Sequence, residues 1–179
     1  DGITRTLWIF DVSNPANILT ASQFTPGTSG FGIVDLWASG KYLYLANGGA
    51  TTAQFQVLDI SNPTSPSVVG TISNTGGAGT FISGAVTSMT AQGRYAFVGT
   101  STGTIYSVDL KDPAFATPVV ASVASSGTGA ASLYAQGRIL YVADNNSNRI
   151  SAVDISTPSA PLAIASYSNT QGGAAAQAV

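Results

Sequence analysis

Short apolar runs alternate with polar turns along this chain, and one of the runs is repeated. Leu7–Phe10 are apolar, and an Asp-Val-Ser-Asn-Pro segment follows them and ends the run. Related segments return three times, and their aspartates are 48, 50 and 45 residues apart. A repeat of this length, built from short apolar runs, is typical of propellers and solenoids. The four copies are 7–15, 55–63, 105–113 and 150–158.

The second repeat unit divides into four expected strands. Its turn signals are Ser39-Gly40, a Gly/Thr-rich stretch at 47–53, and Ser61-Asn62-Pro63. Proline lacks an N–H, and serine and asparagine bond to their own backbone, so the last segment should end a strand. We label the four strands A to D in chain order. The pattern predicts them at 31–38, 41–46, 54–60 and 66–72.

The turn between strands A and B contains a glycine in every complete unit. These residues are Gly40, Gly93 and Gly137, and glycine supplies the positive φ that a tight hairpin needs. Each strand B that follows begins with Lys or Arg and is apolar on both faces. That pattern is typical of a sheet that lies between two other sheets. Helical periodicity is absent.

The strands occur in the order C-D, then A-B-C-D three times, then the start of a further A at 171–179. The prediction is an all-β fold, a β-propeller of four-stranded antiparallel blades with about four blades' worth in this chain. Strand B of the blade shared by the two ends is missing, so either the chain is part of a larger protein or neighbouring subunits complete the ring. We expect one propeller region, 1–179, with units at approximately 1–30, 31–80, 81–128 and 129–170, and with 171–179 starting another blade.

The repeated phrase, together with the Gly-[Lys/Arg]-aromatic strand before it, closely resembles the LVIVD-repeat family. The match is strongest in 7–15 and 55–63, and copy three departs from the pattern at Tyr106-Ser107 and Lys111-Asp112. Copy four, from Leu140 to Thr157, also resembles the related YVTN repeats. The resemblance implies a β-propeller in bacterial or archaeal surface or secreted proteins. It implies no defined enzyme activity.

Composition narrows the possible partners. The net charge is −2 and the six cations are scattered, which argues against nucleic acid and against polybasic membrane attachment. No apolar run approaches the roughly 18 residues of a membrane helix, so membrane insertion is not expected. Charged residues make up only 8% of the chain, and Ser and Thr are abundant. We expect an extracellular or cell-surface protein of a bacterium or archaeon.

The reactive side chains of familiar enzymes are scarce. The sequence has no His, Cys or Glu, so it cannot form Ser-His-Asp or Cys-His arrangements and lacks the usual zinc, haem and iron–sulfur ligands. The glycine-rich stretches at 76–79 and 127–129 lack the lysine of a phosphate-binding loop. We therefore expect no catalytic residue, no cofactor-binding residue and no cofactor.

The aspartates are interpreted mainly as structural. One Asp per copy, just before a turn, should accept backbone N–H bonds and fix the corner between strands C and D. Asp109 and Asp112 flank such a turn. Asp35 lies in an apolar strand at the position of Ser88 and Ser132, where it should be hydrogen-bonded or line a central channel. The phrase aspartates are Asp11, Asp59, Asp109 and Asp154, and the tryptophans Trp8 and Trp37 are expected to pack within strands.

Asp144, Asn146 and Asn148 are weak metal-ligand candidates. Their Asp-x-Asn-x-Asn spacing starts some calcium loops. The sixth position is Arg149 rather than glycine, and no Glu exists to finish the site. A plain polar loop between strands B and C is the favoured interpretation, with no metal.

Three functions stay open on this evidence. The first is a non-enzymatic secreted or surface module for binding, adhesion or structural assembly, whose partner is a protein, a glycan or another copy of itself. The second is a subunit of an extracellular filament or layer that strand exchange completes. The third is a fragment of a propeller enzyme, lactonase-like or dehydrogenase-like, which rests on fold analogy alone.

Overall fold

The structure is a computed structural model that describes residues 6–26, 32–48, 53–73, 82–114 and 118–168. These segments form β-strands joined by turns and contain no helix. The strands are β1 (Leu7–Asp11), β2 (Leu19–Phe24), β3 (Ile33–Ser39), β4 (Tyr42–Asn47), β5 (Phe55–Asp59), β6 (Ser67–Ile72), β7 (Val86–Gln92), β8 (Tyr95–Thr100), β9 (Thr104–Asp109), β10 (Val119–Ala124), β11 (Ala130–Gln136), β12 (Ile139–Asp144), β13 (Arg149–Asp154) and β14 (Leu162–Ser168).

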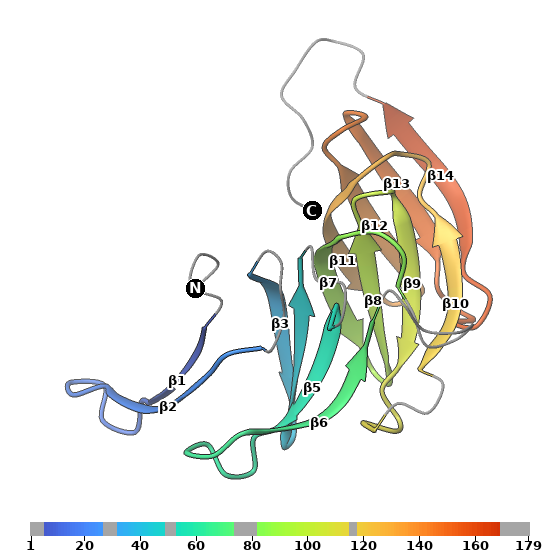
Figure 1. Cartoon of the computed structure of the whole chain (residues 1–179). Coiled ribbons are helices and arrows are strands. Elements are labelled where there is room, and N and C mark those ends of the chain that lie inside the picture. The colour runs from blue at the N-terminus through green and yellow to red at the C-terminus, as the bar shows by residue number, and fades with distance from the viewer. Residues whose placement is uncertain (1–5, 27–31, 49–52, 74–81, 115–117, 169–179) are drawn as a thin grey trace.

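The strands pair in chain order into one hairpin and three four-stranded antiparallel sheets (Figure 1). The hairpin is β1-β2, and the sheets are β3 to β6, β7 to β10 and β11 to β14. We call these units the hairpin, blade 2, blade 3 and blade 4. This order confirms the predicted all-β propeller fold with four-stranded blades. The expected further strand at 171–179 and the glycine-rich stretch at 76–79 lie outside the described residues.

Each A–B turn uses its glycine at the first central position. Ser39 pairs with Tyr42, so the two turn residues are Gly40 and Lys41 rather than the expected Ser39-Gly40. Gly40 has a φ of 57°, and among the described non-glycine residues only Asn148 has a positive φ. A positive φ at the first central residue alone is the type II′ arrangement, which matches the twist of the flanking strands. Strand A therefore extends one residue further than the pattern predicted.

The core lies between the blades, as the two apolar faces of strand B predicted. Phe55 and Val57 of blade 2 pack with Ala96 and Val98 of blade 3, and the opposite face of blade 3 packs on blade 4. Blade 3 is therefore covered on both faces. Burial of apolar surface between blades is the main stabilising contribution in such an array, since each sheet alone would expose an apolar face to water.

The innermost strands β3, β7 and β11 contact one another in sequence, and polar groups join them. Asp35, Ser88 and Ser132 occupy equivalent register positions, each just after a β-bulge. The Asp35 carboxylate accepts the backbone N–H of Met89 at 3.0 Å, and the Ser88 hydroxyl donates to the carbonyl of Ala130 at 2.8 Å. Asp35 is therefore hydrogen-bonded between blades, one of the two environments expected for it, and its equivalence to Ser88 and Ser132 is confirmed.

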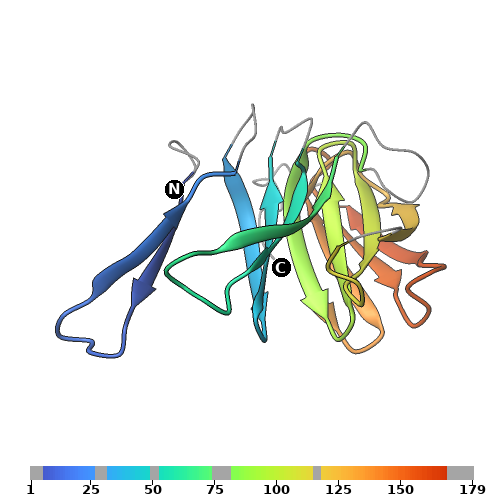
Figure 2. The ribbon, with the colours of Figure 1, turned by 60° about the horizontal axis from the view of Figure 1, so that its bottom comes forward.

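The β1-β2 hairpin lies at one end of the array and blade 4 at the other (Figure 2). Leu7 packs with Leu43, Leu45 and Leu58 of blade 2. These four side chains are at most 7% exposed. The hairpin thus holds the position of strands C and D of a further blade.

Candidate binding faces at the two ends of the array

Blade 4 exposes apolar side chains at positions that are buried in the blades before it. Register places Tyr141 at the position of Phe97, and Ile150 at the position of Ile105. Phe97 and Ile105 are each 1% exposed, whereas Tyr141 is 38% and Ile150 is 43% exposed. The difference arises because blade 4 covers blade 3, and no described residues form a further blade on blade 4. We call this surface, with Tyr134, the blade 4 face.

The other end of the array carries an apolar groove between β1 and β3. Leu36 is 50% exposed, although Met89 and Leu133 at the equivalent positions are 5% and 7% exposed. The groove has a volume of about 700 Å³ and lies where strands A and B of the hairpin's blade would run. It is lined by Thr6, Leu7, Trp8, Phe10, Ile33, Val34, Asp35 and Leu36.

Trp8 lines this groove and is partly exposed, and its packing within its strand is a contact with Phe10. It is 42% exposed and stacks on Phe10, with the ring centroids 6.3 Å apart. Leu7 alternates with Trp8 along β1, so Leu7 faces blade 2 and Trp8 faces away from it. Trp37 differs, because it packs against Tyr44 at a centroid distance of 5.4 Å. Its expected packing role is confirmed.

The phrase aspartates fix the C–D corner in all four copies, as predicted. Each accepts the backbone N–H of the residue two positions later at 2.8 or 2.9 Å. Three of them also pair with the cation that begins strand B of their own blade, a partner that was not predicted. The sequence contained a signal for these ion pairs, since every glycine between strands A and B is followed by Lys or Arg. The pairs are Lys41–Asp59, Arg94–Asp109 and Arg138–Asp154.

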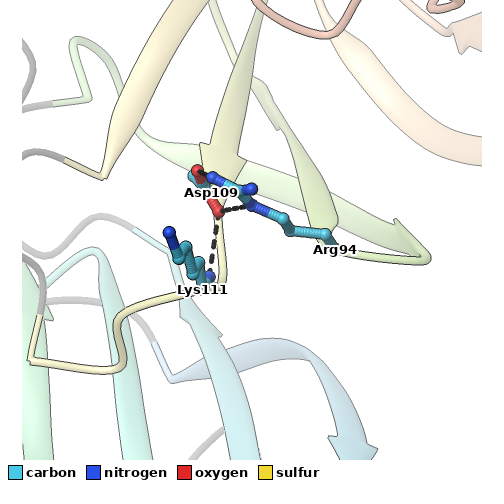
Figure 3. A network of polar contacts seen from close by, with 3 residues as sticks. All are labelled: Arg94, Asp109 and Lys111. Carbon is cyan, nitrogen blue, oxygen red and sulfur yellow. Dashed lines mark hydrogen bonds and ion pairs between the residues drawn. The ribbon is translucent and has the colours of Figure 1, made fainter.

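Blade 3 contains the most developed of these pairs (Figure 3). Arg94 donates through two guanidinium nitrogens to the carboxylate of Asp109, and the N–H of Lys111 donates to the same carboxylate. The hydrogen bond from Arg94 is the main cause that lowers the pKa of Asp109 below its ordinary value. In blades 2 and 4 hydrogen bonds from Ser61 and Ser156 are the main causes that lower the pKa of Asp59 and Asp154.

Stability should therefore depend on pH through Asp109. Because its pKa is lower in the folded state, its contribution is complete above the ordinary value of 3.8 and is lost as pH falls through the lowered folded value. We expect Arg94→Gln to reduce the urea midpoint slightly at pH 7, and we expect this reduction to shrink as the pH falls below 3.8. The reduction is small because the pair is partly exposed.

Urea unfolding of the two proteins across this pH range measures the effect. Arg138→Gln is the matched control, because Arg138 and Asp154 are 4.0 Å apart and should contribute less. A constant difference between wild type and Arg94→Gln at all pH values would contradict the prediction.

Asp11 lacks a strand B cation in the described residues, because its blade consists of the hairpin alone. Its side chain is exposed and accepts the N–H of Ser13. This hydrogen bond is the main cause that lowers the pKa of Asp11. At the groove end, the corner of the repeat is thus formed, and no cation of the described residues pairs with Asp11.

Asp144 is buried and accepts hydrogen bonds from three residues. The N–H of Gly129 donates to Oδ2 at 2.8 Å, and the N–H groups of Asn146 and Ser147 donate to Oδ1 at 3.1 and 2.9 Å. The Asn146 side chain donates its amide to the carbonyl of Thr128 at 3.2 Å. Asn148 adopts a positive φ of 48° in the turn. A metal site at Asp144, Asn146 and Asn148 stays an untested alternative.

The ends of strand B share a structural role that the sequence pattern did not reveal. Asn47, Thr100 and Asp144 occupy the same register position. Asn47 donates its amide to the carbonyl of Ala53, and Thr100 donates its hydroxyl to the carbonyl of Thr104. Each side chain thus holds the loop between strands B and C. Across the described residues, no three His, Cys, Asp or Glu side chains are grouped to hold a metal ion.

Repeated blades, buried faces between them and one corner aspartate per repeat define the chain as a run of β-propeller blades. Its sequence places it in a particular family. The chain belongs to the LVIVD repeat family, whose model matches residues 4–25, 33–74 and 127–169. The match omits copy three, 105–113, where the sequence departs from the repeat. No curated protein matches the chain in sequence.

Solved structures agree on the fold. Sqt1 from Chaetomium thermophilum is 16% identical with a TM-score of 0.74, and the alignment covers 99% of this chain and 44% of Sqt1. A protein from Lactobacillus plantarum is 14% identical with a TM-score of 0.76, covering 97% of this chain and 51% of that one. Apo AztD from Citrobacter koseri is 13% identical with a TM-score of 0.63, covering 98% and 45%. The chain therefore spans about half the length of these structures. Its described residues include no helix that could cross a membrane.

Proposed function

We propose that the protein is a non-enzymatic β-propeller module, secreted or on the cell surface of a bacterium or archaeon, that binds and assembles through the end faces of its blade array. The exposure of Tyr141 and Ile150, at positions that are buried in blade 3, is the observation that carries this proposal. Exposed apolar surface of this kind is typical of interaction sites. The partner is a protein, a glycan or another copy of the chain.

The two ends of the array differ, which favours head-to-tail assembly of copies of the chain as a second way in which this function is carried out. One end carries the groove with Trp8 and Leu36, and the other carries the blade 4 face. A contact between unlike faces forms a ring if the rotation closes and a filament if it does not. The filament form predicts that the mass of the particle rises with concentration.

Tyr141→Glu tests the proposal, because it places a charge at the centre of the blade 4 face. We expect the variant to raise the dissociation constant for self-association or partner binding by at least about tenfold. Multi-angle light scattering over a range of concentrations measures self-association, and a pull-down from the source organism's extracellular fraction measures partner binding.

Ser65→Glu is the control, because Ser65 is exposed at a C–D corner and is not among the residues that line the groove or form the blade 4 face. If wild type stays monomeric at high concentration and Tyr141→Glu loses no partner, the proposal fails. An activity screen covers the enzyme alternative: hydrolysis abolished by Asp35→Asn would replace the binding function with catalysis.

A further inference from the structure

The last strand of each blade has an open edge at the outside of the array. Among the described residues, β6 pairs with β5 alone and β10 pairs with β9 alone. Each of the two is followed in the chain by the first strand of the next blade, which lies at the inner edge of its own sheet. The open edges of β6 and β10 are therefore a feature of each blade rather than of either end of the array. We call these two edges the rim.

The rim lacks the side chains that commonly protect an open strand edge. Open edges offer unpaired N–H and C=O groups to other chains, and proteins block them with charged side chains, proline, short strands or β-bulges. β6 has the sequence Ser-Val-Val-Gly-Thr-Ile and β10 has Val-Val-Ala-Ser-Val-Ala, so neither contains a charged residue or a proline. Such uncharged segments of β-forming residues favour pairing with a strand of another copy.

A β-bulge interrupts the last strand of every copy at the same place. In blade 3 the register with β9 shifts between Val119 and Ala121, so Val120 is an extra residue outside the register. In each copy the shift lies opposite the first and second residues before the phrase aspartate. The extra residues of the four copies are Ala21, Val69, Val120 and Ile164.

The bulges belong to the edges of the sheets and not to their centres. The pairs between strands B and C keep a regular register in all three blades. Strand A is bulged as well, and the residues just after its bulge, Asp35 and Ser88, bond to the next blade. At the outer edge no described strand lies beside β6 or β10. The outer bulge therefore has a different reason from the inner one.

The physical effect of an outer bulge is to shorten the regular edge. An extra residue bends the strand, increases its twist and disrupts the ladder locally. A straight strand from another copy can therefore pair on only one side of the bulge. The longer regular stretch is 121–124 in β10 and 70–72 in β6. These stretches are shorter than an ordinary strand of roughly five or six residues, so strand addition gains few backbone bonds.

We propose that the outer bulges of blades 2 and 3 block strand addition at the rim, so that copies of the chain do not associate side by side through β6 or β10. This inference rests on the proposed function in one respect, because it leaves the end faces as the surfaces through which copies associate. It distinguishes two kinds of assembly: contact between end faces is permitted, and a layer joined by strand pairing along the rim is not.

Deletion of Val120 tests the inference, because it removes the extra residue while the residues on either side keep their partners on β9. All proteins in the test carry Tyr141→Glu to suppress association through the blade 4 face. We expect the mass of the deletion protein in multi-angle light scattering to rise about twofold or more with concentration. Hydrogen exchange of the fragment that contains 121–124 should slow in parallel, since strand pairing protects its amides.

Val120→Ala is the matched control, because it shortens the same side chain but keeps the extra residue, and it should stay monomeric. Adding Ser122→Lys to the deletion should restore the monomer, because Ser122 is exposed on β10 and a charge there opposes edge pairing. Deletion of Val69, with and without Thr71→Lys, repeats the comparison on β6, where Thr71 is exposed. Circular dichroism and urea unfolding verify that each variant is folded.

Folded deletion proteins that stay monomeric, or that associate equally well with the added lysine, would overturn the inference. Loss of the folded signal in both deletions would also overturn it, because the bulges would then serve the twist of the blades. The proposed function is judged separately, by whether Tyr141→Glu lowers association of the protein with intact bulges. If it does not, association of the deletion protein that Ser122→Lys abolishes still supports the role of the bulge.

Discussion

Replacing Ile105 by alanine is expected to lower the free energy of unfolding by about 2–5 kcal/mol. Ile105 is 1% exposed and packs between blades 3 and 4 with Leu140 and Val153. The substitution removes buried methyl and methylene groups and leaves a cavity that rigid neighbouring sheets fill poorly. Equilibrium unfolding in urea, monitored by tryptophan fluorescence and circular dichroism, measures the change.

Ile150→Ala is the control for this prediction, because Ile150 has the same side chain at the same repeat position. It is 43% exposed on the blade 4 face. We expect this substitution to lower the free energy of unfolding by about 1 kcal/mol or less in the isolated chain, since nearly half of the residue is exposed and it has less packing to lose than Ile105. Similar losses for the two variants would mean that blade 4 is covered in solution, which would itself support association through that face.

Asp144→Ala is expected to lower the free energy of unfolding by at least about 3 kcal/mol, which is the second of the two large effects. The carboxylate is fully buried and accepts the N–H groups of Gly129, Asn146 and Ser147. Alanine leaves these donors without their acceptor, and the cost is largest for the N–H of Gly129, which is buried. The close approach of Gly127 is a second sign of the tight fit, because a Cβ there would overlap the carboxylate.

Asp144→Asn refines this test, since it keeps the shape but replaces one acceptor oxygen by a donor. The stability of Asp144→Asn, measured by thermal and urea unfolding, should lie between the stabilities of wild type and Asp144→Ala. Asp112→Ala is the control: Asp112 accepts one N–H at an exposed turn and should change stability by less than about 1 kcal/mol. A rise in melting temperature with calcium that Asp144→Ala abolishes would instead establish the metal site.

Repetition made the fold predictable from the sequence. The repeated segment, an apolar run followed by aspartate and Ser-Asn-Pro, predicted strand C and the corner after it. The glycines between strands A and B predicted the hairpins. Errors were confined to ends of elements, such as the turn at Gly40 and Lys41. Turn residues and alternation are local properties, so a single sequence contains the information that sets them.

For the corner aspartates, the sequence analysis predicted the hydrogen bonds within the turn but not the ion pairs. Their turn bonds are local, two residues apart, and were predicted. The pairs with Lys41, Arg94 and Arg138 join neighbouring strands, so they depended on register. The repeated Gly-[Lys/Arg] pattern contained that information, and aligning the copies on the aspartate would have revealed it.

The sequence alone determined the strand order, the corners and the apolar character of both blade faces. Only the tertiary structure decided which of those faces are covered. Ile105 and Ile150 have the same local context, yet one is buried and the other is half exposed. The physical reason is that burial depends on the presence of a neighbouring blade, and at the two ends of this array that neighbour is not among the described strands.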